Sequence, residues 1–168
     1  MRMFTALCSA LCLLAGADAF AAGKDLSTHA ERTAFSETGR YEEVQRLCRE
    51  FAASHPKQVR CFSFGKSAEG REMMVLAANM QGVLTPEAAL AAKLPVTLIQ
   101  GGIHAGEIDG KDAGFLVLRE LLQNPGKDNP LNRQVLLFVP VFNVDGHERF
   151  KAFNRPNQRG PKEMGWRT

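Results

Sequence analysis

Residues 94–107 read Leu-Pro-Val-Thr-Leu-Ile-Gln-Gly-Gly-Ile-His-Ala-Gly-Glu, and this stretch decides the fold. Its first half, from Leu94 to Gln100, is a mainly apolar run. A run that is apolar on both faces predicts a central strand that is covered on both sides. Two glycines end the run, so His104 and Glu107 are expected in a turn directly after the strand.

Helix and strand patterns alternate on either side of this stretch. Apolar residues recur at helical spacing at Val44, Leu47, Cys48 and Phe51, and glycines at 65–70 predict a hairpin turn. The expected helices are 41–53, 85–92 and 109–122, and the expected strands are 59–64, 73–78, 94–100 and 134–139. This succession predicts an α/β fold with a partial mixed, mostly parallel sheet and flanking helices.

Length and composition are those of one globular domain. The chain has 168 residues, of which 45% are hydrophobic and 23% charged, with a net charge of +3. The most basic stretch, Arg149 to Lys162, is rich in Asn, Pro and Gly. Because nothing else indicates phosphate recognition, we interpret it as a solvated loop and expect no nucleic-acid partner.

The first 21 residues are typical of a signal peptide. A short positive start precedes an apolar core from Phe4 to Ala15, and small residues around Ala19 and Ala21 suit cleavage. A membrane anchor is the alternative, but the apolar core is too short to span a bilayer. We therefore expect an exported protein, periplasmic or secreted, without stable membrane insertion after signal removal. Residues 22–40 are expected to form an irregular lead-in.

Two cysteines, Cys48 and Cys61, remain in the mature chain. In an oxidising compartment they could form a disulfide between the first expected helix and the strand that follows it. Two buried free thiols are an equally good interpretation, since the sequence does not give the Cα separation that a disulfide requires.

His104 and Glu107 are candidate metal ligands. In open α/β sheets, ligands bind beyond the carboxyl ends of the strands, where this turn is expected. Zinc accepts the nitrogen and oxygen ligands that the two side chains would supply. The alternative is a turn histidine beside a glutamate that only complements a helix dipole.

Four segments, taken together, resemble the zinc metallocarboxypeptidase family. His104-Ala105-Gly106-Glu107 resembles its His-x-x-Glu metal motif, and Gly65 to Arg71 resembles its Gly-x-Ser-x-Glu-Gly-Arg hairpin. Asn143-Val144-Asp145-Gly146 resembles its Asn-Pro-Asp-Gly segment, with valine in place of proline, and Trp166-Arg167 resembles its Trp-Arg pair. The resemblance covers residues 41–168 and corresponds to the N-terminal part of the family's catalytic domain.

The resemblance implies a function and roles for particular residues. His104 and Glu107 would be the first two Zn²⁺ ligands of an enzyme that removes C-terminal residues from peptide substrates. Arg167 would stabilise the oxyanion that develops on the scissile carbonyl group. Asn143 and Asp145 would shape the backbone beside the site.

Other parts of the family pattern are missing from the 168 residues. These are the third zinc ligand, the Asn-Arg pair that binds the substrate carboxylate, and the catalytic glutamate. His147 does not match the third-ligand position and is interpreted as a solvated loop residue. We therefore expect a truncated domain, poorly soluble because its sheet has an unpaired edge, and inactive by itself. The alternatives are a deacylase of the same superfamily and a non-catalytic exported module.

Overall fold

The computed structural model describes residues 25–155 and 159–167, so the expected signal peptide lies outside the described residues. The elements, in chain order, are α1 (His29–Arg32), α2 (Tyr41–Ser54), β1 (Val59–Lys66), β2 (Glu72–Ala78), α3 (Pro86–Ala92), β3 (Val96–Gln100), α4 (Asp109–Gln123), the 3-10 helix η1 (Pro130–Asn132), β4 (Val135–Val139), α5 (Val144–Glu148), β5 (Lys151–Ala152) and β6 (Glu163–Met164). Every helix and strand expected between residues 41 and 139 is present, with ends shifted by at most a few residues.

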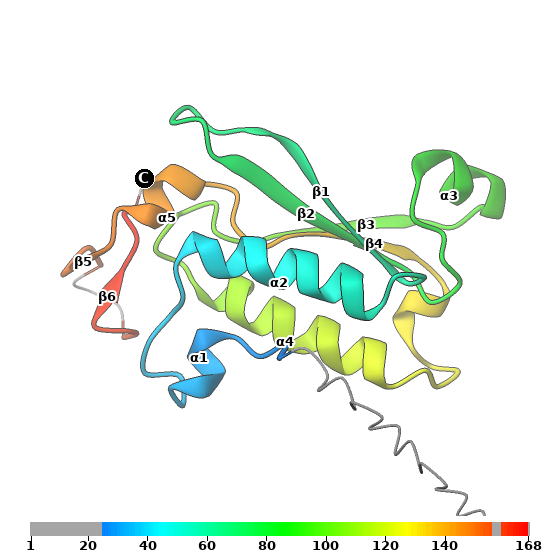
Figure 1. Cartoon of the computed structure of the whole chain (residues 1–168), viewed down its shortest axis with the longest axis horizontal. Helices are drawn as coiled ribbons and strands as arrows, with labels where there is room; N and C mark the ends of the chain where they lie inside the picture. Colours follow the sequence, from blue (N-terminus) through cyan, green and yellow to red (C-terminus); the bar gives the residue numbers. More distant parts are fainter. Residues whose placement is uncertain (1–24, 156–158, 168) are drawn as a thin grey trace, which may run out of the picture.

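The main sheet has four strands in the order β1-β2-β4-β3 (Figure 1). Strands β3 and β4 are parallel, and Leu98 lies opposite Leu137. Strand β2 runs antiparallel to both β1 and β4. The sheet is mixed, as predicted. However, only one of the three described pairings is parallel, so the expectation of a mostly parallel sheet was wrong for the described strands, because the expected hairpin contributes an antiparallel half.

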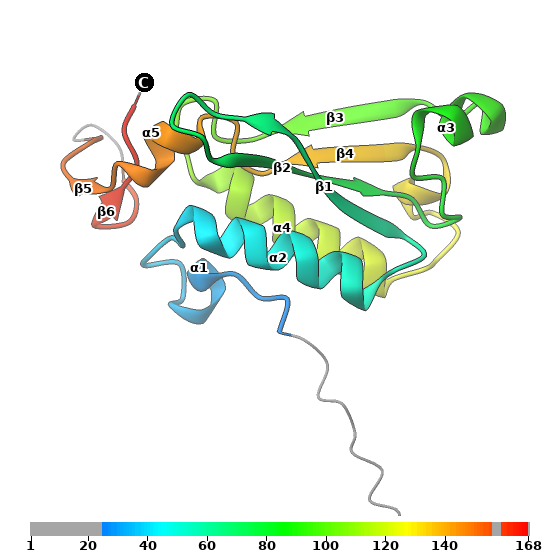
Figure 2. The same cartoon turned by 45° about the horizontal axis from the view of Figure 1, so that its top comes forward.

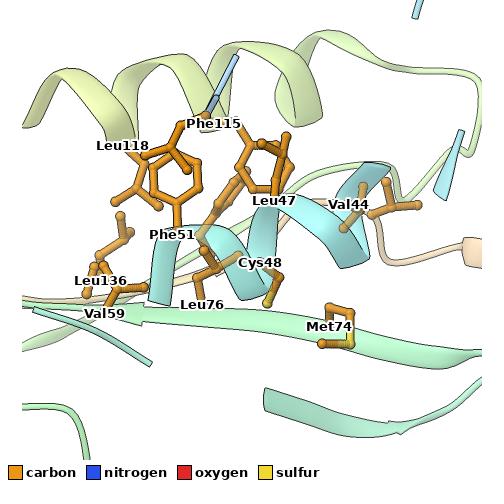
Figure 3. Packing of buried hydrophobic residues seen from close by; sticks show 14 of the residues in the cluster. Val44, Leu47, Cys48, Phe51, Val59, Met74, Leu76, Phe115, Leu118 and Leu136 are labelled. Carbon is orange, nitrogen blue, oxygen red and sulfur yellow. The ribbon is translucent and has the colours of Figure 1, made fainter. Parts of the chain in front are cut away.

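Helices α2 and α4 lie side by side against one face of the sheet (Figure 2). Three phenylalanines join the layers: Phe115 of α4 stacks on Phe51 of α2 at 5.8 Å and meets Phe138 of β4 edge-on at 5.3 Å, measured between ring centroids. All three are buried, and Figure 3 shows Phe51 and Phe115 within the hydrophobic core. A Cβ on Gly114 would lie 2.2 Å from the Phe138 ring, so a glycine within α4 permits this close contact.

The position of strand β3 in the sheet also differs from the one expected. It was predicted to be a covered central strand, but it lies at the end of the described sheet and pairs there only with β4. The exposed fractions of Val96, Leu98 and Ile99 are 51%, 57% and 48%. Successive side chains of a strand point to opposite faces, so both faces of β3 expose apolar groups. The covered central strand is β4, because it has a strand on each side and the two helices beneath it.

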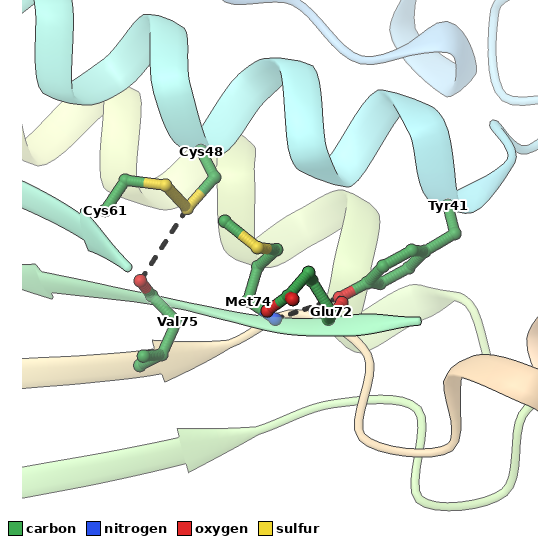
Figure 4. Close-up of a disulfide and its surroundings, with 6 residues drawn as sticks. All are labelled: Tyr41, Cys48, Cys61, Glu72, Met74 and Val75. Carbon is green, nitrogen blue, oxygen red and sulfur yellow. Dashed lines mark hydrogen bonds between the residues drawn. A yellow bond between two sulfur atoms is a disulfide. The ribbon is translucent and has the colours of Figure 1, made fainter. Parts of the chain in front are cut away.

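A disulfide joins α2 to β1. The Cα atoms of Cys48 and Cys61 are 5.4 Å apart, within the range that the bond requires. The bond lies on the sheet-facing side of α2, close to Val75 of β2 (Figure 4). Tyr41, also on α2, donates a hydrogen bond to Glu72 O and accepts one from Met74 N, and burial raises its pKa to about 12. The structure thus decides in favour of the disulfide, which the sequence left open.

The described part of the lead-in, from residue 25, is less irregular than expected. Residues 29–32 form α1, whose first turn is stabilised by a capping box between Thr28 and Glu31. Glu31 also pairs with Arg119 of α4, which fixes α1 against the helical layer. The reason is local: Thr28 and Glu31 have the spacing of a capping box, a signal that composition alone does not reveal.

A buried group of charges lies where α1, α2 and α4 meet. Lys111 is 1% exposed, and its Nζ lies 2.6 Å from Asp112 Oδ1 and 3.6 Å from Glu43 Oε2. Thr38 Oγ1 donates to the other Asp112 oxygen at 2.7 Å. We call Glu43, Lys111 and Asp112 the buried triad. It fixes the first turn of α4, and therefore the turn that precedes it.

The basic stretch 149–162 contains part of a second, two-stranded sheet formed by β5 and β6. Its charges are not all solvated as expected, since the side chain of Arg155 is only 5% exposed. Among the described residues, no helix combines the length and hydrophobicity needed to cross a membrane.

Candidate functional site

The turn after β3 is held by backbone hydrogen bonds to the chain that follows β4. Gly101 N donates to Val139 O at 2.8 Å, Phe142 N to Gly101 O at 2.9 Å and Asn143 N to Gly102 O at 2.9 Å. Two parallel strands therefore end at one shared edge, and the segments leaving them are hydrogen-bonded to each other. This edge is the position at which ligands bind in open α/β sheets.

Glycines are required where the two segments approach. A Cβ on Gly101 would lie 2.6 Å from Pro140 O, which is closer than Cβ atoms approach in proteins. Gly102 has a φ of +59° and lies against Val141, so a side chain there would be both strained and crowded. The Gly-Gly pair that ended the apolar run in the sequence thus allows the turn to lie against the chain after β4.

The side chains of His104 and Glu107 lie close together in this turn. His104 Nδ1 lies 3.2 Å from Glu107 Oε1, and a backbone hydrogen bond of 2.9 Å from Glu107 N to His104 O closes the turn between them. Ala105 is fully buried below, whereas the two ligand candidates are 57% and 48% exposed. The buried residue anchors the turn, and both candidate ligands point towards solvent.

The donor separation fits zinc. Two ligands of a tetrahedral zinc ion, each at about 2.1 Å, lie about 3.4 Å apart. The observed 3.2 Å between His104 Nδ1 and Glu107 Oε1 is close to this value, so one cation could bind both atoms without a change of backbone. Within residues 25–155 and 159–167, no group of three or more His, Cys, Asp or Glu side chains could hold a metal. The described residues supply two donors.

The hairpin tip is tied to the segment after β4 by Asp145 of α5. Asp145 Oδ1 accepts from Ser67 Oγ at 2.7 Å and from Arg71 Nη1 at 2.5 Å, and Oδ2 accepts from Glu69 N at 3.0 Å. Burial favours a raised pKa for Asp145, but these hydrogen bonds outweigh it and hold the pKa below its usual value. Asp145 is thus a structural residue that joins two segments singled out in the sequence.

Asn143 caps the first turn of α5, because its side-chain oxygen accepts from Gly146 N at 3.0 Å. Trp166 N donates to Gly146 O at 2.8 Å and brings the last described residues beside α5. A Cβ on Gly165 would lie 2.9 Å from Ala105 O, so this segment also contacts the His-x-x-Glu turn. Arg167 follows directly and is exposed at the surface.

The position of His147 differs from the one expected from the sequence. It was interpreted as a solvated loop residue, but it lies in α5 and is 1% exposed. Its ring centroid is 6.4 Å from that of Tyr41 and 5.3 Å from that of Phe150, and Nδ1 lies 3.3 Å from Glu148 Oε1. Gly165 lies directly against its backbone, which allows the close packing. Burial lowers the pKa of His147 and favours the neutral ring.

Arg155 is the residue that the sequence did not indicate. Its Nη2 donates to Glu107 Oε1 at 2.9 Å, so it contacts a candidate metal ligand directly. It was treated as one charge of a basic loop, and no local signal separates it from its neighbours there. A cavity of about 410 Å³ is lined by Glu107, Asp109 and Arg159, among others. A larger cavity of about 710 Å³ lies between α1, α2 and β6 and touches neither His104 nor Glu107.

Known proteins resemble this chain in sequence. A family model described as zinc carboxypeptidase matches residues 44–167. Carboxypeptidase Z from Homo sapiens is 28% identical over 117 residues, which is 64% of this chain and 17% of that protein. Carboxypeptidase A6 from Mus musculus is 29% identical over 119 residues, which is 65% of this chain and 25% of that protein. The chain thus spans a quarter or less of the length of these two relatives.

Solved structures show the same fold. Carboxypeptidase A from Helicoverpa armigera aligns with a TM-score of 0.56 and 26% identity, covering 67% of this chain and 26% of that chain. Thrombin activatable fibrinolysis inhibitor aligns with a TM-score of 0.58 over 74% of this chain and 30% of that chain; at 20% identity, this likeness concerns the fold alone. Because the family model matches most of its residues, the chain belongs to the zinc carboxypeptidase family.

Proposed function

We propose that this protein is a zinc-dependent metallocarboxypeptidase that removes C-terminal residues from peptides. In this proposal His104 and Glu107 are two of the zinc ligands, and Arg167 stabilises the oxyanion. The observation that carries the proposal is the 3.2 Å separation of His104 Nδ1 and Glu107 Oε1 at the carboxyl edge of two parallel strands. Family membership supports the peptidase over the deacylase of the same superfamily.

The roles of the residues follow from their chemistry. A zinc ion, when bound, supplies Lewis acidity that activates water and polarises the scissile carbonyl group. His104 and Glu107 hold the cation from a turn whose backbone is fixed to the segment after β4, so little reorganisation is needed. Arg167 follows Gly165, whose backbone packs against the turn, and in this proposal its guanidinium group stabilises negative charge as it develops on the carbonyl oxygen.

We also propose that the catalytic site is completed by protein outside these 168 residues. Catalytic zinc normally has three protein ligands, whereas the described residues supply two. The half-exposed apolar side chains of Val96, Leu98 and Ile99 on β3 are typical of a strand that is covered by further chain. We therefore expect the 168-residue chain to bind zinc weakly and to have no peptidase activity by itself.

The disulfide supports an exported protein. Such bonds persist in oxidising compartments, and Cys48 and Cys61 meet as a covalent pair. Together with the signal-like residues 1–21, this favours a periplasmic or secreted location.

Calorimetric titration of the 168-residue chain with Zn²⁺ tests the metal site. We expect one weak site, lost in His104→Ala and in Glu107→Gln. His55→Ala is the matched control, since His55 lies at the end of α2 and contacts no residue of the turn. Zinc binding that survives both turn variants, or that disappears in the control, contradicts the assignment.

The nucleotide sequence after the codon for Thr168 tests the completed domain. An open reading frame that encodes an Asn-Arg pair, then a histidine and then a glutamate would supply the missing family residues. The longer protein should then release the last residue of N-acylated peptides. A stop codon at that point would instead favour a non-catalytic exported module.

A further inference from the structure

Arg155 contacts the candidate metal centre although the family motifs quoted above do not include it. Its Nη2 donates to Glu107 Oε1 at 2.9 Å, and the same oxygen lies 3.2 Å from His104 Nδ1. The guanidinium group and the imidazole therefore meet at one carboxylate oxygen. The side chain of Arg155 is 5% exposed, whereas that of Glu107 is 48% exposed, so a buried cation holds a half-exposed anion.

The stem of Arg155 is fixed by the turn itself. A Cβ on Gly106 would lie 2.5 Å from Arg155 Cδ and 2.6 Å from Gly165 O, so the missing side chain at position 106 leaves the space that the arginine stem fills. Position 106 of the His-x-x-Glu motif therefore requires a glycine, because Arg155 and Gly165 both pack closely against it. Any larger residue there would displace the arginine from Glu107.

The loop that carries Arg155 is fixed as well. Asn154 Nδ2 donates to Arg149 O and to Met164 O, both at 2.8 Å, and so bridges the segments that contain β5 and β6. Phe153 has a φ of +67°, which reverses the chain just before the bridge. These contacts direct the arginine towards the turn after β3.

We propose that Arg155 is a positioning residue that orients the carboxylate of Glu107 for metal binding; this inference rests on the proposed zinc site. A carboxylate on a flexible side chain can turn its oxygens away from a cation, and a hydrogen bond to one oxygen limits that rotation. Arg155 holds one oxygen from a buried position and keeps the carboxylate beside His104. Groups that hold a metal ligand in this way typically change metal affinity by 10- to 100-fold when removed.

Electrostatic repulsion between Arg155 and the metal would change zinc affinity in the opposite direction. A cation near the site repels Zn²⁺, so a purely electrostatic role predicts tighter zinc binding when Arg155 is neutralised. Arg159 is the matched control for this effect. It lines the cavity beside Glu107, carries the same charge and is exposed. Neutralising Arg159 removes a nearby charge without removing the hydrogen bond that Arg155 makes.

Zinc dissociation constants of Arg155→Met, Arg155→Lys and Arg159→Met, each in the 168-residue chain, test the inference by competition with a chromophoric chelator. Methionine retains an unbranched stem against Gly106, so the fold should be kept. We expect Arg155→Met to weaken zinc binding about tenfold. We expect Arg155→Lys to bind with intermediate affinity, and Arg159→Met to stay within about twofold of the unchanged chain.

Equal affinity in Arg155→Met and the unchanged chain, or tighter binding in the variant, would overturn the positioning role. The same holds if Arg159→Met weakens binding as much as Arg155→Met does. If Arg155→Met does not fold, the lysine variant decides, because it keeps the charge but not the planar donor group. An unchanged chain that binds no Zn²⁺ contradicts the proposed metal site itself, which is a different failure.

Discussion

Two groups of ionisable side chains lie near the start of α4 in the folded chain, and they differ in burial. In the buried triad, the side chains of Lys111, Asp112 and Glu43 are 1%, 6% and 9% exposed and contact one another. In the turn just before it, His104 and Glu107 are 57% and 48% exposed. Both groups bring a side-chain nitrogen and a carboxylate oxygen to similar distances, so contact geometry alone does not separate them.

The difference lies in what surrounds each group. The triad is enclosed by α1, α2 and α4. Lys111 pairs with both carboxylates, Thr38 donates to Asp112, and Arg32 and Arg46 also pair with Glu43. The backbone of the turn is held by hydrogen bonds, but its side chains point outwards, where a cation can bind between His104 and Glu107. We infer that the buried triad stabilises the backbone of the turn, and that His104 and Glu107 bind metal from this fixed backbone.

The largest effect on stability is expected in the buried triad. Lys111→Met leaves the buried carboxylate of Asp112 without this cation, whereas Glu43 keeps its ion pairs with Arg32 and Arg46; the loss should cost about 3–5 kcal/mol in the free energy of unfolding. Urea denaturation of the 168-residue chain measures this. Lys127→Met, an exposed lysine in the loop after α4, is the control and should change stability little. A loss below about 1 kcal/mol for Lys111→Met would show that the triad is not structural.

The next largest effect on stability is expected for the disulfide between α2 and β1. Cys48 and Cys61 are 13 residues apart, and a loop of that size corresponds to about 3 kcal/mol in the free energy of unfolding. The double variant Cys48→Ser/Cys61→Ser should lose this amount but keep its zinc affinity. Equal stability of the oxidised and double-variant chains would show that the disulfide does not stabilise the fold. Loss of zinc binding in the double variant would show that the disulfide and the turn after β3 are coupled.

A smaller effect is expected from pH. Because burial lowers the pKa of His147, the folded state binds a proton less readily than the unfolded state. Stability from this residue is therefore complete above the unfolded pKa of about 6.5 and is lost as pH falls through the folded pKa. Urea denaturation between pH 8 and pH 5 should show this decline, and His147→Asn should reduce its slope. An unchanged slope would assign the decline to other groups, such as His55, whose pKa burial also lowers.

The smallest effect on stability is expected at the turn itself. His104→Ala removes an exposed side chain that contacts Glu107, so the free energy of unfolding should change by no more than about 0.5 kcal/mol. Differential scanning fluorimetry compares the variant with the unchanged chain. A loss of stability as large as that of Lys111→Met would mean that the turn histidine is structural, and the contrast between the two groups would disappear.

Most of the fold could be predicted from the sequence, because local patterns determine its elements. The helical spacing of Val44, Leu47 and Phe51 and the start at Thr85-Pro86 both led to helices found in the structure. The position of β3 could not be predicted, because an apolar run indicates burial but not which neighbours supply it. A signal for the buried triad was present: Lys111 is on the apolar stripe of α4 with Phe115, Leu118 and Leu122.

The site could be predicted in part. His104 and Glu107 could be proposed as a pair because their motif is local, three residues apart in one turn. Arg155 contacts Glu107 across 48 residues of sequence, and no pattern within the basic stretch marks it. His147 was misjudged for a related reason: its burial depends on Tyr41, Phe150 and Gly165, which come together only in the folded chain.

The most direct test of the central claim is anomalous diffraction at the zinc edge from crystals of the 168-residue chain grown with Zn²⁺. We predict a single strong peak about 2.0–2.2 Å from both His104 Nδ1 and a Glu107 carboxylate oxygen. A peak at other side chains only, or none in the turn after β3 at saturating Zn²⁺, would contradict the account.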